Sequence, residues 1–173
     1  MKMKKAFLRR GFTLIELMIV IAIMGIVILT APKIFTKTFQ FVQLFIARTE
    51  IQKNARGALA NINRDLRQAK ADTIVIDALS GQPPHSRITF TKYNASGSTQ
   101  QLSYYQKGNA LYMSNDGSAT GRLIAGSLRY VAFTYPRTDD DGIVSISITF
   151  EKATYEGGTK ALQMAVEKVR VMN

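Results

Sequence analysis

A chain of 173 residues has room for one compact domain and an accessory element, because domains commonly span about 100 to 150 residues. Five of the 23 basic residues lie in the first ten positions, and without them the formal net charge falls from +11 to 18 minus 12, or +6. The other basic residues are scattered among acidic ones, which is typical of a solvated surface. The sequence contains no cysteine, which excludes disulfides, thiolate metal sites and a cysteine nucleophile but leaves the compartment undecided.

The N-terminal part of the chain predicts a membrane span. Residues 1–11 are basic and free of acidic residues, and residues 12–31 form an apolar run in which Glu16 is the sole charge. Twenty helical residues rise about 30 Å, which matches the hydrocarbon core of a bilayer, whereas a secretory signal core spans about 7 to 15 residues. We therefore expect residues 12–32 to cross a membrane, and because no A-x-A-like site follows, to stay attached to the rest of the chain.

The charges that flank the predicted span predict its orientation. Five basic residues precede it, and only Lys33 and Lys37 follow it closely. Since basic residues favour the cytoplasmic side, the N-terminus is expected in the cytoplasm and the bulk of the chain outside.

Glu16 is an unusual residue for a membrane span, because a charged side chain inside a bilayer costs on the order of 3 kcal/mol even on lenient scales. If the chain were cut between Gly11 and Phe12, the new α-amine of Phe12 would lie one helical turn from Glu16 on the same face and could neutralise it. Gly11 suits a cut site, because a residue without a Cβ lets a protease approach the backbone closely.

The string Gly-Phe-Thr-Leu-Ile-Glu-Leu-Met, residues 11–18, resembles the prepilin motif of type IV pilins and type II secretion pseudopilins. The resemblance implies cleavage after Gly11 by a membrane aspartic prepilin peptidase, N-methylation of Phe12, and extraction of the subunit from the bacterial inner membrane into a helical filament. It also implies that Glu16 meets the amine of Phe12 in an adjacent subunit during assembly. The alternative is a pair between the two groups within one chain.

Gly25 and Pro32 both weaken the predicted helix, because Gly costs about 1 and Pro about 3 kcal/mol in a helix interior. They predict a kink or a melted turn near residues 28–32, unless this region is simply the membrane exit.

Residues 33–74 predict a stalk helix. Apolar residues recur at steps of three or four, which is helical periodicity: Ile51, Ala55, Leu59, Ile62, Leu66 and Ala69. The opposite positions are polar, so this half should lay its apolar face on the head. Residues 34–46 are apolar on most faces, which in the resembling family reflects packing against the helices of other subunits; a longer tilted span or contact with the head are the alternatives.

Residues 75–173 predict an exported, β-rich head. Breaker clusters at 80–84, 94–98, 115–118 and 139–142 separate segments of alternating polarity. The predicted strands are Arg87–Tyr93, Gln101–Gln106, Ala110–Met113, Val131–Tyr135, Val144–Phe150 and Leu162–Val171. Short connections favour an antiparallel sheet, hence an α+β fold in which the second half of the long helix packs on the head. Val166 and Val169 interrupt the alternation of the last segment and predict a bulge or a change of packing face near Glu167.

The order of these head segments, with the ending Arg170-Val-Met-Asn173, resembles J-type pseudopilins and PilW-like minor pilins. This resemblance implies a minor subunit near the filament tip that initiates assembly for protein secretion. The alternative is a DNA-uptake or adhesion minor pilin that binds an extracellular ligand. Six tyrosines with basic neighbours could stack on a nucleic acid, yet strand-rich cores use tyrosine anyway, so no nucleic acid is expected as a partner.

Little in the sequence predicts catalysis or a cofactor. His85 is the only histidine, it lies in a predicted loop, and no Gly-rich phosphate loop is present, so we expect neither an enzyme nor a bound cofactor. The run Asp139 to Asp141 could offer oxygens to Ca²⁺, but its spacing is not that of an EF-hand, and acidic hairpin turns are common. An acidic turn is the preferred interpretation.

Overall fold

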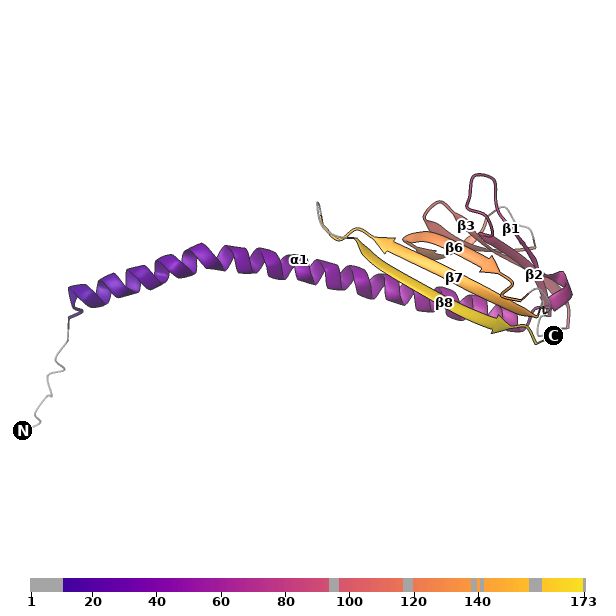
Figure 1. Cartoon of the computed structure of the whole chain (residues 1–173), viewed down its shortest axis with the longest axis horizontal. Helices are drawn as coiled ribbons and strands as arrows, with labels where there is room; N and C mark the ends of the chain where they lie inside the picture. Colours follow the sequence, from indigo (N-terminus) through magenta and orange to yellow (C-terminus); the bar gives the residue numbers. More distant parts are fainter. Residues whose placement is uncertain are drawn as a thin grey trace, which may run out of the picture. The chain divides into compact units, whose positions relative to one another are not determined.

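The computed structural model describes residues 11–93, 97–116, 120–137, 140, 142–155 and 160–172. These residues form one α-helix, α1 (Leu14–Arg67), one 3-10 helix, η1 (Ala71–Thr73), and eight strands (Figure 1). The strands are β1 (Val75–Asp77), β2 (Arg87–Tyr93), β3 (Thr99–Lys107), β4 (Ala110–Asn115), β5 (Arg122–Gly126), β6 (Leu128–Thr134), β7 (Ile143–Lys152) and β8 (Ala161–Arg170). The chain divides into two compact units, Met1–Val42 and Gln43–Asn173, and α1 begins in the first and ends in the second.

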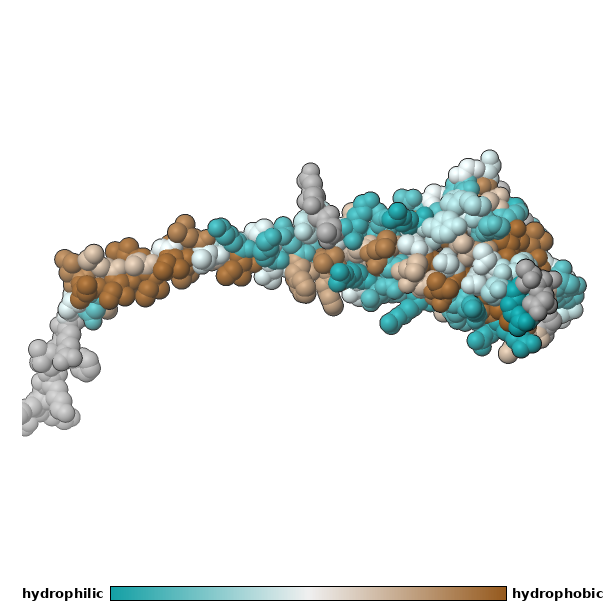
Figure 2. Space-filling view, viewed as in Figure 1, coloured by the Kyte–Doolittle hydropathy of each residue, from teal (hydrophilic) through white to brown (hydrophobic). Residues whose placement is uncertain are grey.

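The first unit consists of the apolar part of α1. Its large apolar side chains are exposed, and Figure 2 shows a mainly hydrophobic surface at the start of the helix, with hydrophilic residues interspersed farther along. Among the described residues, α1 is the one helix that is long and apolar enough to cross a membrane, judged by length and composition. A helix suits such a segment because it satisfies its own backbone hydrogen bonds.

Pro32 lies inside α1, and the helix continues through it. The expected melted turn near residues 28–32 is therefore absent from this described segment. Proline removes one backbone donor, but the turns on either side keep theirs, and the hydroxyl groups of Thr30 and Thr36 also donate to carbonyl oxygens one turn back.

α1 ends at Arg67, seven residues before the predicted end of the stalk helix at residue 74. The chain leaves the helix because it joins a sheet: Ala69 forms a bridge with Lys92, and the Lys70 N–H donates to the Thr91 carbonyl (2.9 Å). The β-branched residues that follow favour a strand over a helix and form β1 against β2.

The eight strands form two antiparallel sheets within the described residues. The first has the order β1-β2-β3-β4-β5 and the second the order β6-β7-β8. All six predicted strands are confirmed, with β2 at the predicted bounds. β1 and β5 were not predicted, because both are short and lack a clear alternation. The turn at residues 80–84 is also confirmed, whereas the other three predicted turns lie partly outside the described residues.

The core of the second unit lies between α1 and the sheets. The helix contributes a row of alanines and branched aliphatic residues. The strands contribute larger side chains, including aromatic ones, which pack against this row. The fully buried large side chains include Ile51, Ile62, Leu66, Phe90, Tyr104, Phe133 and Phe150. Each such side chain contributes about 1.5 to 3 kcal/mol when it leaves water. The predicted packing of the amphipathic half of α1 on an antiparallel head is confirmed.

Two alternatives were predicted near Glu167: the bulge is wrong, and the change of packing face is confirmed. β8 pairs with β7 in an uninterrupted register, from Ile143 opposite Arg170 to Lys152 opposite Ala161. The alternation is regular, but the apolar residues change faces along the strand: Ala161 and Val169 point inward, whereas Val166 points outward. Glu167 points inward and accepts a hydrogen bond from the Asn63 side chain on α1.

Candidate functional site

The residues predicted for processing and assembly lie together at the start of α1. Thr13 directly precedes the helix, and its N–H and its hydroxyl both donate to Glu16 Oε2 at 2.8 Å. In return, the Glu16 N–H donates to Thr13 Oγ1 at 3.3 Å. This reciprocal arrangement is a capping box, which satisfies N–H groups that have no partner in the first helical turn. The Thr-x-x-Glu signature in the sequence could have predicted this role of Thr13.

The capping box leaves part of the Glu16 carboxylate unused. Both of its accepted bonds fall on Oε2, so Oε1 has no hydrogen-bond partner among the described residues. In the uncut chain the Phe12 nitrogen is part of a peptide bond, and its side chain is exposed. The pairing of Glu16 with a Phe12 amine, whether in the same chain or in a neighbour, stays a prediction. A carboxylate can accept several hydrogen bonds, so the cap and an amine could be bound together.

Gly11 is exposed, and a Cβ built on it would meet nothing within 4 Å. The fold of the chain therefore does not itself require glycine at this position. A requirement for glycine would arise from a protein that binds this segment, as the prediction of a cut after Gly11 implies.

A second polar cluster, unexpected from the sequence, fixes the end of α1 to the first sheet. Asp65 is only 2 % exposed and accepts hydrogen bonds from the Tyr104 hydroxyl (2.6 Å) and from Lys92 Nζ (2.8 Å). Arg64 Nε lies 3.5 Å from the same carboxylate. An acidic residue near the C-terminus of a helix is disfavoured by the helix dipole, so these partners are what stabilise Asp65 there.

The cluster changes the pKa of both acidic groups. Burial acts to raise the pKa of Asp65, but the hydrogen bonds from Lys92 and Tyr104 and the nearby positive charges outweigh it and leave the pKa lowered. Burial, and then the hydrogen bond to the Asp65 carboxylate, raise the pKa of the Tyr104 phenol. At neutral pH the carboxylate is therefore charged and the phenol is a donor.

These shifts predict a pH dependence of stability. A carboxyl group whose pKa is lower in the folded state contributes stability above its unfolded pKa, and that contribution is lost as the pH falls through the folded pKa. We expect the difference in unfolding free energy between the wild type and Asp65→Asn to shrink as the pH falls below about 4. Urea titrations at a series of pH values measure this difference. A constant difference across that range would contradict the assignment.

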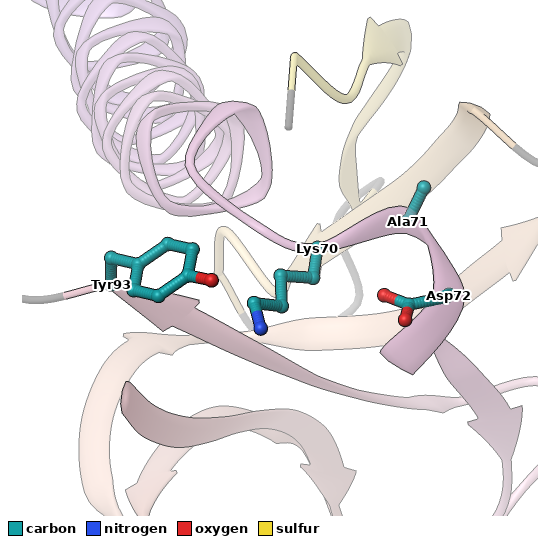
Figure 3. Close-up of a pocket in the computed structure, with 4 residues that line it drawn as sticks. All are labelled: Lys70, Ala71, Asp72 and Tyr93. Atoms are coloured by element: carbon teal, nitrogen blue, oxygen red, sulfur yellow. The ribbon is translucent and has the colours of Figure 1, made fainter. Parts of the chain in front are cut away.

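A shallow pocket of about 510 Å³ lies beside the end of α1, lined by Lys70, Ala71, Asp72 and Tyr93 (Figure 3). Lys70 Nζ lies 4.6 Å from the centre of the Tyr93 ring, and this neighbour, followed by Asp72, raises the pKa of Lys70. The face of an aromatic ring attracts a cation, so this contact helps to hold the corner together. The four residues that line this pocket do not form a pair of nucleophile and base.

The other polar residues singled out from the sequence do not gather into a site in the described part of the chain. His85 has a positive φ of 58°, and its carbonyl accepts the N–H of Phe133 (2.9 Å), which is a structural role. Asp139 and Asp141 lie outside the described residues; Asp140 accepts the Gly142 N–H (2.9 Å), as in a turn. No group of three or more His, Cys, Asp or Glu residues that could hold a metal ion occurs among the described residues.

The tyrosines do not form one exposed stacking surface. Tyr104 is fully buried, and Tyr105 is buried and stacks on Tyr112 with the ring centres 5.9 Å apart. Stacking on a nucleic acid requires exposed rings. Tyr104 and Tyr105 therefore contribute to the internal packing of the head.

Comparison with known proteins identifies the N-terminal segment. Residues 7–32 match the family model described as the prokaryotic N-terminal methylation motif. No curated protein and no solved structure matches the chain significantly. The matched segment contains Gly11, Phe12 and Glu16 together with the apolar part of α1 that follows them. Motif and apolar helix together support a membrane-anchored chain with one candidate span among the described residues.

Proposed function

We propose that this chain is a structural subunit of a type II secretion pseudopilus or a type IV pilus-like filament, processed after Gly11 and N-methylated on Phe12. The single observation that carries the proposal is the methylation motif at residues 7–32, with Glu16 in the first turn of a long apolar helix. In this proposal residues 1–11 are a cleaved cytoplasmic leader, residues 12–32 the span, residues 33–74 the stalk and residues 75–173 the exported head. The precursor lies in the inner membrane with its N-terminus in the cytoplasm.

Glu16 is proposed to select the register of assembly. A subunit that enters the filament brings its new Phe12 amine to the Glu16 carboxylate of a neighbour, where Oε1 has no partner within the described chain. In a medium of low dielectric constant this pair is much stronger than in water. If two spans were shifted along the helix axis relative to each other, both charges would be unpaired in hydrocarbon. This cost disfavours every other register.

The exposed aromatic segment beyond the span supports assembly as well. Several large side chains on α1 have no contact that buries them in the isolated chain: Ile34, Phe35, Phe39, Phe41, Val42, Phe45 and Ile46. Exposing this many apolar side chains to water is unfavourable for a monomer. The helices of other subunits would cover these side chains in a filament. The same segment, residues 34–46, bears one basic residue, Lys37, so it can pack in an apolar bundle.

We further propose a minor subunit near the filament tip that helps to start assembly for protein secretion. The support is the resemblance of the head pattern to minor pseudopilins. The alternative, a DNA-uptake or adhesion minor pilin, is less well supported because Tyr104 and Tyr105 are buried. Filament number in a strain without this chain separates the two: a tip subunit that starts assembly lowers the number of filaments, whereas a ligand-binding subunit lowers only uptake or adhesion.

The processing prediction tests the proposal directly. Protein purified from membranes that contain a prepilin peptidase is expected to begin at Phe12 with one added methyl group, and protein from membranes without the peptidase to begin at Met1. Gly11→Leu should give the Met1 form in both, because a side chain blocks close approach to the backbone. Gly25→Ala is the matched control, since nothing lies within 4 Å of either added Cβ. An unmethylated chain that begins at Met1 despite the peptidase would refute the proposal.

A further inference from the structure

The two sheets of the second unit have four edge strands among the described residues, and three of them are protected against pairing with another chain. An unprotected edge presents a row of backbone N–H and C=O groups that another strand can bind. β1 is only three residues long. β5 has five residues, and its register with β4 shifts at Tyr112, so neither edge is long and regular.

The third edge strand, β6, is covered by the first sheet. Three of its N–H groups donate across to loops and strand ends of that sheet. The donors Leu128, Val131 and Phe133 bond to Asn109 O (2.9 Å), Gln106 Oε1 (3.1 Å) and His85 O (2.9 Å), respectively. The Gln106 amide also donates to the Arg129 carbonyl (3.2 Å). Backbone groups on this side of β6 are therefore occupied by the chain itself.

The fourth edge strand, β8, has none of these protections. It is ten residues long, contains no proline, and pairs with β7 along its whole length without a bulge. No strand of the described chain lies on its other side, where Figure 1 shows it as the outermost strand of its sheet. In an antiparallel pair every second residue directs its N–H and C=O away from the partner, so the outer edge of β8 offers a row of backbone groups that no strand of the described chain pairs. The Met164 carbonyl accepts a hydrogen bond from the Gln163 side chain (3.2 Å), which an incoming strand would have to displace if that carbonyl lies on the outer edge.

The outward face of β8 is apolar at its centre. Leu162, Met164 and Val166 are 57 %, 64 % and 58 % exposed, and they follow one another on the same face. Edge strands usually carry charges at such positions, because exposed apolar edges aggregate. Three consecutive apolar residues on the outer face, beside a free backbone edge, therefore mark an interaction surface.

The charges that continue this face favour a particular partner. Lys168 and Arg170 follow the apolar row on the same face, and no acidic side chain pairs with either of them among the described residues. Lys160, which precedes β8, pairs with Glu151 on β7. The C-terminal end of β8 is thus positively charged and selects for a strand with acidic side chains at the end that meets it.

A second copy of this chain is a poor occupant of the edge. In an antiparallel pair of two β8 strands, the register that places Met164 opposite itself also places Lys160 opposite Lys168. A shift by two residues places Lys160 opposite Arg170 in one direction and opposite Val166 in the other, so Lys160 faces a like charge or an apolar side chain in each of these registers. Like charges directly opposite each other are destabilising, and the two-fold symmetry repeats the clash at both ends.

We infer that β8 docks an extended segment of a different protein, which adds to the sheet as an antiparallel fourth strand. Its backbone bonds to the free edge, its apolar side chains cover Leu162, Met164 and Val166, and its N-terminal acidic residues face Lys168 and Arg170. The inference does not depend on the proposed filament role, because it concerns the head alone.

Two synthetic peptides of ten residues test the inference on the full chain in nanodiscs. Both alternate Val and Thr and are N-methylated along one edge so that they cannot pair with themselves; one carries two N-terminal glutamates and the other two N-terminal lysines. We expect the acidic peptide to bind at least about tenfold more tightly, as 1.4 kcal/mol of charge complementarity would give. Fluorescence anisotropy of labelled peptide measures both affinities.

Variants locate the binding on β8. Leu162→Lys is expected to weaken the acidic peptide by about tenfold or more, because it removes an apolar contact and charges the edge. Leu123→Lys on β5 is the matched control, since Leu123 is also 57 % exposed, and it should bind like the wild type. The double variant Lys168→Glu/Arg170→Glu should reverse the preference towards the lysine peptide. Unchanged thermal unfolding by circular dichroism confirms that each variant is folded.

Three outcomes would overturn the inference. The first is no binding of either peptide, or equal binding of both. The second is equal weakening by Leu162→Lys and Leu123→Lys, which would mean non-specific apolar contact. The third is a disulfide-linked dimer of Met164→Cys without added peptide, which would assign the edge to a second copy; the sequence contains no cysteine, so any such dimer forms through residue 164.

Discussion

Replacing Glu16 by alanine is expected to leave the processed subunit in the membrane and to reduce the amount in sheared filaments by more than about tenfold. The reason is the loss of the pair between the carboxylate and the Phe12 amine of a neighbour. Two unit charges 4 Å apart attract by about 4 kcal/mol at an effective dielectric constant of 20. An unpaired Phe12 ammonium would then have to enter the apolar bundle alone. Immunoblots of sheared and membrane fractions measure the ratio.

Glu16→Gln separates the charge from the helix cap. The glutamine carbonyl oxygen can still accept the Thr13 N–H and hydroxyl bonds, so the capping box persists while the negative charge is lost. Thr13→Val does the reverse, because it removes the hydroxyl and leaves the carboxylate. If register depends on charge, Glu16→Gln assembles as poorly as Glu16→Ala, and Thr13→Val assembles normally.

The opposite pattern would contradict the assembly role. Normal filaments from Glu16→Gln together with poor filaments from Thr13→Val would show that the residue acts only as a cap. Normal filaments from Glu16→Ala would remove the role altogether. Because all three variants retain Gly11 and Phe12, mass spectrometry of each can show that processing is intact before assembly is compared.

Local sequence patterns were enough to predict the elements that depend on local physics. The apolar run after Phe12 predicted the candidate span, and alternating polarity predicted β2, β6 and β7, because side-chain period and burial are coupled directly. The Gly-Phe-Thr-Leu-Ile-Glu string predicted the processing segment, and the methylation-motif match covers that segment. These features need no knowledge of distant contacts.

Long-range contacts explain what the sequence did not predict. The end of α1 at Arg67 depends on pairing with β2, more than twenty residues later. β8 has no bulge because several of its apolar residues lie on the outer face of the sheet. Alternation alone cannot decide which of the two faces of a strand is buried. In the sequence, Asp65 is one of several polar residues of the helix. Its burial and its bonds to Tyr104 and Lys92 depend on the folded structure.

Asp65→Asn is expected to lower the free energy of unfolding by about 2 to 4 kcal/mol, because removing one partner of a buried ion pair leaves the other charge uncompensated. Asparagine keeps an acceptor for the Tyr104 hydroxyl, so the loss reports mainly the unpaired Lys92. Urea unfolding of the full chain in micelles, followed by tyrosine fluorescence, gives the free energy, since the chain has seven tyrosines and no tryptophan.

Asp77→Asn is the matched control, because Asp77 pairs with Arg87 at a much more exposed position and such pairs contribute about 0 to 1 kcal/mol. A double variant, Asp65→Asn with Lys92→Met, removes both charges and should recover part of the loss, since no buried charge then lacks a partner. If Asp65→Asn costs no more than Asp77→Asn, or if the double variant is less stable than the sum of its single changes, then the Asp65 carboxylate does not fasten α1 to the sheet through its charge. The same end of α1 must in that case be held by its other contacts, such as the apolar packing around Leu66 and the hydrogen bond between Asn63 and Glu167.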